Sequence, residues 1–121
     1  MSGFARVHVL ATPEAQAQGV IGRPGIAADE VFLFPDIDPA GTYFHMAGVP
    51  FAIEIAFLDG DLRVLSVERM EPGSGRAWPT PGTRHAAEAA PGALAAQGIR
   101  PGVVWEQLRR AAADEGGSGG P

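Results

Sequence analysis

The sequence predicts a mainly β, α+β fold, a compact rolled sheet or partly closed β-barrel with one or two short helices. Its 17 glycines and 11 prolines divide 121 residues into short segments, which is typical of a β-rich domain with many turns. Several segments between these breaks are alternating or wholly apolar over four to eight residues, the usual length of a strand. With 45% apolar residues, the chain can form one core. We therefore predict a single domain over residues 3–108, followed by a helical extension and flexible tail over 109–121.

The N-terminal region should contain a strand and a short helix. Residues 4–11 have valines alternating with Arg6 and His8, the pattern of a half-buried strand. A short helix is expected over residues 13–20, because Thr12 is a typical N-cap and a proline follows it at the first helical position.

The middle of the chain should supply the central strands. Residues 31–34 are an apolar run closed by a proline, and extended structure resumes over residues 43–46. Residues 51–58 form the strongest strand pattern. The dipeptide at 59–60, Asp-Gly, favours a type I′ hairpin turn into a partner strand over residues 62–68.

The C-terminal region should hold a long loop, one strand and two helices. The loop is expected over residues 71–83, which are rich in proline and glycine, and a strand over 84–89 follows it. A one- or two-turn helix over residues 91–97 should end at Gly98 in the left-handed conformation. Helix propensity also predicts a helix over residues 105–113.

Composition excludes several classes of function. The chain has no cysteine, so disulfides and thiolate sites are excluded, and it has no lysine, so Schiff-base chemistry is excluded too. A net charge of −5 without a basic run argues against nucleic-acid binding. No leader or membrane-spanning run is seen, which predicts a cytoplasmic protein that does not enter membranes. Because the three histidines lack metal-ligand spacing, we expect neither a metal site nor a cofactor.

Four segments together resemble the domain of unknown function 192 family. They are GVIGRPGI around Arg23, VFLFP ending at Pro35, FHMAGVPFAIEIAFLDGD over residues 44–61, and EAAPGALAAQGIRPG over residues 88–102. The resemblance implies a compact β-rich domain, a partly closed barrel or rolled sheet, and no established reaction. The aromatic-Met-Lys-Asn stretch that is usual in the family is replaced in this chain by His-Met-Ala-Gly at residues 45–48.

The first candidate site pairs Glu54 with His45. Glu54 is the only charge in an eight-residue apolar strand, and burying a lone carboxylate is unfavourable. Its side chain should therefore meet water, and the small alanines beside it would leave a hollow there. Glu54 could then bind a ligand or act in acid–base chemistry with His45 or an arginine as partner; alternatively, it lies on a solvated face.

Four further residues complete the candidate ligand-binding set. Met46 follows His45 on the open face that we expect. Glu88, among alanines, could form an ion pair with Arg23 or Arg84, or could belong to the site. Arg23 lies in a glycine-rich turn that could receive an anion. Trp78 could anchor a partner, act as a lid, or cover an open end of the barrel.

These features leave three functional hypotheses. The first is a non-catalytic binding or accessory module for a small molecule or a peptide segment. The second is a small hydrolase or isomerase in which Glu54 works with Glu88 or His45. The third is a structural or oligomer-forming domain that buries apolar residues around Trp78 and Trp105. No catalytic residue and no oligomeric state can be assigned from the sequence.

Overall fold

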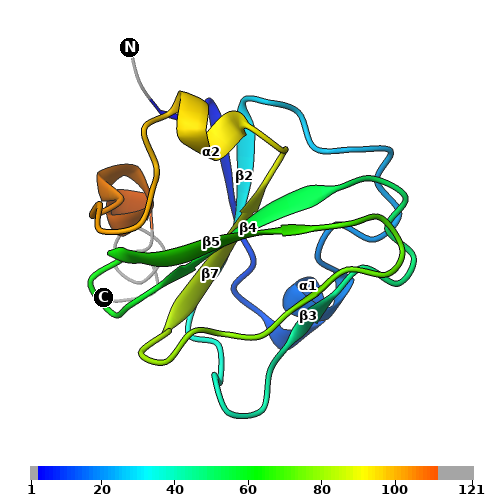
Figure 1. Cartoon of the computed structure of the whole chain (residues 1–121), viewed down its shortest axis with the longest axis horizontal. Helices are drawn as coiled ribbons and strands as arrows, with labels where there is room; N and C mark the ends of the chain where they lie inside the picture. The colour runs from blue at the N-terminus through cyan, green and yellow to red at the C-terminus, as the bar shows by residue number, and fades with distance from the viewer. Residues whose placement is uncertain (1–2, 112–121) are drawn as a thin grey trace, which may run out of the picture.

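The computed structural model describes residues 3–111, which are arranged around one mixed five-stranded sheet (Figure 1). The strand order across this sheet is β1-β2-β7-β4-β5. The elements in chain order are β1 (Arg6–Val9), α1 (Pro13–Gln18), β2 (Glu30–Phe34), β3 (Phe44–His45), β4 (Ile53–Leu58), β5 (Val64–Met70), β6 (Arg76–Ala77), β7 (His85–Ala89) and α2 (Ala93–Ala96). The mainly β, α+β class is thus confirmed.

The topology leaves the sheet open. β1 pairs with β2 in parallel, because the segment between them, with α1, crosses from one end of the sheet to the other. The remaining pairs in the sheet are antiparallel. β3 and β6 form a separate two-stranded ribbon. Since β1 and β5 are the edges of the sheet, it does not close into a barrel over the described part of the chain.

Both faces of the sheet are buried, each in its own core. On one face Leu33 and Ala56 pack with Leu94 of α2, and with Trp105 and Leu108 from the C-terminal segment. The residues of the other core include Phe34, Phe44, Met46, Ile55 and Phe57. The ribbon therefore covers that second face. Burial on both sides explains why β2 and β7 are buried along their full lengths.

The β4–β5 hairpin differs from the predicted type I′ turn. The Leu62 amide donates to the Asp59 carbonyl, and the Asp59 amide donates to the Arg63 carbonyl, so the loop is longer than two residues. The left-handed residue is Leu62, at φ 61°, and not Gly60. Two contacts hold this conformation: the Asp59 side chain accepts the Arg63 amide at 2.9 Å, and Leu62 is buried in the first core. Tertiary packing thus selected the turn.

The helix ends follow the sequence closely. Thr12 caps α1 by accepting the Ala15 amide, and the helix ends at Gln18, two residues earlier than expected. Gly98 follows α2 at φ 74°, and its left-handed conformation is confirmed. Residues 106–111 are helical. The rest of the predicted helix and tail, 112–121, lies outside the described residues. No helix within residues 3–111 has the length and apolar character needed to cross a membrane.

Candidate functional site

A cleft of about 250 Å³ lies on the face of the sheet that carries the second core. Residues 16–21, from α1 and the turn after it, line it together with residues 42–45, which are β3 and the two residues before it. Phe34, Ile53 and Glu88 contribute side chains from the sheet itself. The cleft therefore lies between two connecting segments, above the central strands.

Glu88 brings a carboxyl group to this cleft from the middle strand of the sheet. Its register neighbours are Phe32 on β2 and Ile55 on β4, so its immediate surroundings on the sheet are apolar. The residue is only 5% exposed, and burial raises the pKa of its carboxyl group to about 8. At neutral pH the Glu88 carboxyl group is therefore largely protonated.

The Glu88 carboxyl group forms no ion pair or hydrogen bond with another residue in 3–111. Every polar side-chain atom in residues 3–111 that is fully buried has a hydrogen-bond partner. The carboxyl oxygens thus keep a small accessible surface, and Glu88 lines the cleft. A ligand in the cleft can therefore supply the missing hydrogen-bond partner.

Two glutamines beside the cleft donate their amide groups to the backbone. Gln16 Nε2 donates to the carbonyls of Leu10 and Pro35, each at 3.0 Å, and Gln18 Nε2 donates to the Ile21 carbonyl. Because carbonyl oxygens only accept, the nitrogen end of each side chain must face them. Gln16 therefore uses both of its N–H groups and keeps only its acceptor oxygen, whereas Gln18 keeps its oxygen and one N–H.

The rim carries exposed aromatic groups. Tyr43 is 48% exposed and stacks on Trp78, which is 62% exposed, with ring centroids 5.7 Å apart. His45 is also exposed, and its Nδ1 accepts the Ala47 amide at 3.2 Å. Trp78 consequently does not cover a barrel end, because the sheet is open and the indole lies on the surface.

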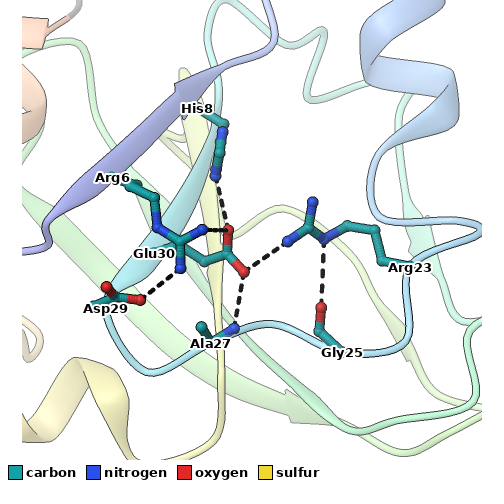
Figure 2. Close-up of polar contacts among 7 residues, drawn as sticks. All are labelled: Arg6, His8, Arg23, Gly25, Ala27, Asp29 and Glu30. Atoms are coloured by element: carbon teal, nitrogen blue, oxygen red, sulfur yellow. Dashed lines mark hydrogen bonds and ion pairs between the residues drawn. The ribbon is translucent and has the colours of Figure 1, made fainter.

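A second polar cluster on the same sheet face is centred on Glu30 (Figure 2). The residue is 1% exposed. One carboxylate oxygen of Glu30 contacts His8 Nε2 at 2.8 Å, and the other accepts from Arg23 Nη2 at 2.7 Å and from the Ala27 amide at 2.8 Å. Arg6 lies 3.6 Å from the first oxygen. The cluster ties β1 and the loop before β2 to the start of β2.

The charge on Glu30 is stabilised by this cluster. Burial by itself would raise the pKa of the carboxyl group. The Ala27 and His8 hydrogen bonds and the charges of Arg23 and Arg6 outweigh burial and lower the pKa to about 2. Glu30 and Glu88 lie on one sheet face, yet one is fixed as a carboxylate and the other is held as an acid.

Sequence reasoning missed the Glu30 cluster and mispaired Glu88. The expected ion pair between Glu88 and Arg23 or Arg84 is wrong, because Arg23 bonds Glu30 and Arg84 bonds Asp36. Glu30 is the first residue of β2 and is followed by a four-residue apolar run, which is a weak sequence signal of a site. Its partner His8 comes from a parallel neighbour, and a parallel register cannot be read from a local turn.

Glu54 does not face the cleft. It is in register with Ala89, which belongs to the first core, whereas Glu88 is in register with Ile55. Because alternate residues of a strand face opposite sides, the Glu54 and Glu88 side chains lie on opposite faces of the sheet. Glu54 is half-buried and accepts the Gly92 amide at 3.1 Å, just before α2. The expected acid–base pairing of Glu54 with Glu88 is therefore ruled out by geometry.

Two other candidates also lie in the interior. Met46 is 1% exposed and packs in the second core, so its side chain belongs to the interior rather than to an open face. Trp105 is 2% exposed in the first core and cannot provide the surface contact expected of an oligomer interface. Of the six predicted ligand-binding residues, only His45 and Glu88 line the cleft over the sheet. Within residues 3–111, no three His, Asp or Glu side chains converge as a metal site would require.

Comparison with known proteins gives a family and a fold. The model of the DUF192 family, described as "Uncharacterized ACR", matches residues 2–106. The chain is similar to a protein of unknown function from Novosphingobium aromaticivorans, with 26% identity and a TM-score of 0.63, over 82% of this chain and 71% of that one. A suggested transcription regulator from Sinorhizobium meliloti has 18% identity and a TM-score of 0.61, over 79% and 76% of the two chains, and is similar in fold alone. A search among curated proteins gave no match.

Proposed function

This chain belongs to the DUF192 family, and we propose that it acts as a non-catalytic binding module whose cleft over Glu88 receives a small molecule. The observation that carries the proposal is the buried Glu88 carboxyl group, which lines the cleft without a partner among the described residues.

The position of Glu88 is unfavourable for folding, which supports a role in binding. Burying a polar group without a hydrogen bond costs about 1–3 kcal/mol in proteins. An alanine, as at the flanking positions Ala87 and Ala89, would carry no such penalty. A perturbed acid in a cleft is a common mark of a functional site.

The dimensions of the cleft limit the size of the ligand. A volume of about 250 Å³ corresponds to about eight water molecules at their volume in the liquid. Drug-sized ligands occupy larger sites, of roughly 300–1,000 Å³. We therefore expect a ligand of about eight non-hydrogen atoms, with an apolar part against Phe34 and Ile53 and a polar group at Glu88.

A ligand screen by thermal shift and NMR tests this proposal. Wild-type protein and the variants E88Q and E54Q would be screened against small metabolites, sugars and short peptides. We expect ligands that stabilise the wild type and E54Q but not E88Q, because Glu54 faces the other side of the sheet. Ligands that act equally on all three proteins, or no ligand at all, would contradict a site at Glu88.

Acid–base catalysis is the second candidate, because His45 and Glu88 line the same cleft. A small hydrolase or isomerase would convert the bound molecule. NMR spectra of each ligand found by the screen, followed over hours with wild-type protein, separate the two functions. An unchanged ligand supports the binding module, whereas conversion that H45Q and E88Q abolish supports the enzyme.

A further inference from the structure

We infer that the cleft selects a small organic ammonium ion, whose positive charge pairs with the carboxylate of Glu88. This inference rests on the proposed binding function and names the chemical class of its ligand. Three properties of the cleft point to a cation rather than to an anion or a neutral polar group.

The first property is the absence of a cation from the lining. No arginine lines the cleft formed by the described residues, and the chain contains no lysine. Arg23 Nη2 contacts Glu30 at 2.7 Å, and Arg84 Nε contacts Asp36 at 3.1 Å, so both arginines predicted to reach Glu88 are engaged elsewhere. The counter-charge for Glu88 can then come from a ligand.

The second property is the supply of acceptors. Gln16 uses both of its N–H groups on backbone carbonyls and Gln18 uses one, and each side chain retains its acceptor oxygen. An alkylammonium group carries three N–H donors and no acceptor, as in a lysine side chain, so it suits a lining of this kind. A carboxylate ligand, by contrast, would find no arginine or lysine among the described residues of the lining to pair with its charge.

The third property is the presence of aromatic rings in the lining. The rings of Phe34 and Phe44 meet edge to face with centroids 5.2 Å apart, and both residues line the cleft together with Tyr43. A cation is attracted to the face of an aromatic ring, more strongly where water is excluded. The same rings can pack against the apolar part of an amine.

Binding should displace a proton. Burial raises the pKa of Glu88 to about 8, so the free protein holds the neutral acid at pH 7. An adjacent ammonium group favours the carboxylate, and the Glu88 proton passes to the buffer while the amine keeps its own. The other groups facing this region are Tyr43 and His45 in the lining, and Arg23 and His8, which both lie against the Phe32 ring. Arg23 and His8 are already bonded to Glu30.

Three probes of similar shape test the inference: benzylammonium, benzyl alcohol and benzoate. Binding would be followed by NMR and by calorimetry at pH 7, in phosphate and in Tris, whose ionisation enthalpies differ. We expect benzylammonium alone to bind, with an apparent enthalpy that differs between the two buffers because a proton is released. The E88Q variant should weaken its binding about ten-fold or more and remove the buffer dependence, whereas E54Q should preserve both.

The outcomes separate this inference from the proposed function. If benzyl alcohol or benzoate binds at the Glu88 cleft and benzylammonium does not, the ligand class is wrong while the binding function stands. Benzylammonium binding without proton release in wild-type protein also overturns the inference, and that measurement needs no variant. If none of the probes shifts resonances of the cleft and the broader screen also finds no ligand, both proposals are overturned.

Discussion

Replacing Glu88 by glutamine should flatten part of the pH dependence of stability. The pKa of this carboxyl group is about 8 in the folded protein, against 4.5 as its ordinary value. Between these pH values the folded state binds the proton that the unfolded state has lost, so wild-type stability falls as pH rises. Each pH unit in this window is worth about 1.4 kcal/mol. From pH 5 to pH 7 Glu88 should therefore lower the free energy of unfolding by about 3 kcal/mol.

Urea denaturation of wild type and E88Q at pH 5, 6, 7 and 8 measures this effect. The quantity of interest is the difference between the two proteins, because contributions that both share cancel in it. The contribution of His85 is one of these: burial lowers its pKa, so this contribution to stability rises with pH. The difference should grow in favour of E88Q by about 3 kcal/mol between pH 5 and pH 7.

The E54Q variant is the matched control. It makes the same substitution on the neighbouring strand, on the opposite face of the sheet. The difference between E54Q and wild type, measured over the same pH range, shows what this substitution does away from the cleft. A constant difference between E88Q and wild type would refute the argument, because it would mean that Glu88 ionises in the folded protein as it does in the unfolded chain.

Further predictions concern the rest of the fold. E30Q should lower the free energy of unfolding at pH 7 by about 3 kcal/mol in urea denaturation, because it unbalances a buried ionic cluster. Wild-type stability should also fall below pH 4.5, as Glu30 is protonated toward its folded pKa of about 2, and E30Q should lack this decrease. G98A should cost about 1–2 kcal/mol by the same assay, because Gly98 is left-handed and an added Cβ meets nothing within 4 Å, so only backbone strain remains. Acrylamide should quench the tryptophan fluorescence of W105F, which retains the exposed Trp78, far more than that of W78F, which retains the buried Trp105. Equal quenching of the two variants would contradict the burial of Trp105.

Much of the fold could be predicted because its signals are local. Thr12 followed by proline marked the start of α1, and Gly98 marked the end of α2, since each residue type fits one backbone conformation. The alternating pattern predicted a strand over residues 51–58, and β4 lies within that range. The hairpin turn was wrong because burial of Leu62 selected a different loop from the one that Asp-Gly favours.

The candidate site depended on which strands lie side by side. Glu54 drew attention because it is the only charge in a long apolar strand, yet its face was decided by register with Ala89. Local sequence could not show that β7 lies between β2 and β4, which places Glu88 between Phe32 and Ile55. Burial between these two neighbouring strands raises the pKa of the Glu88 carboxyl group.

The mainly β, α+β class, the family and the helix caps could be read from the sequence, because the chemistry of a cap is complete within a few residues. Tertiary packing made Glu30 a fixed carboxylate and Glu88 a protonated acid beside a cleft. The ionisation of a group depends on the charges and the water around it. Those surroundings come from segments far apart in the chain that meet only after folding.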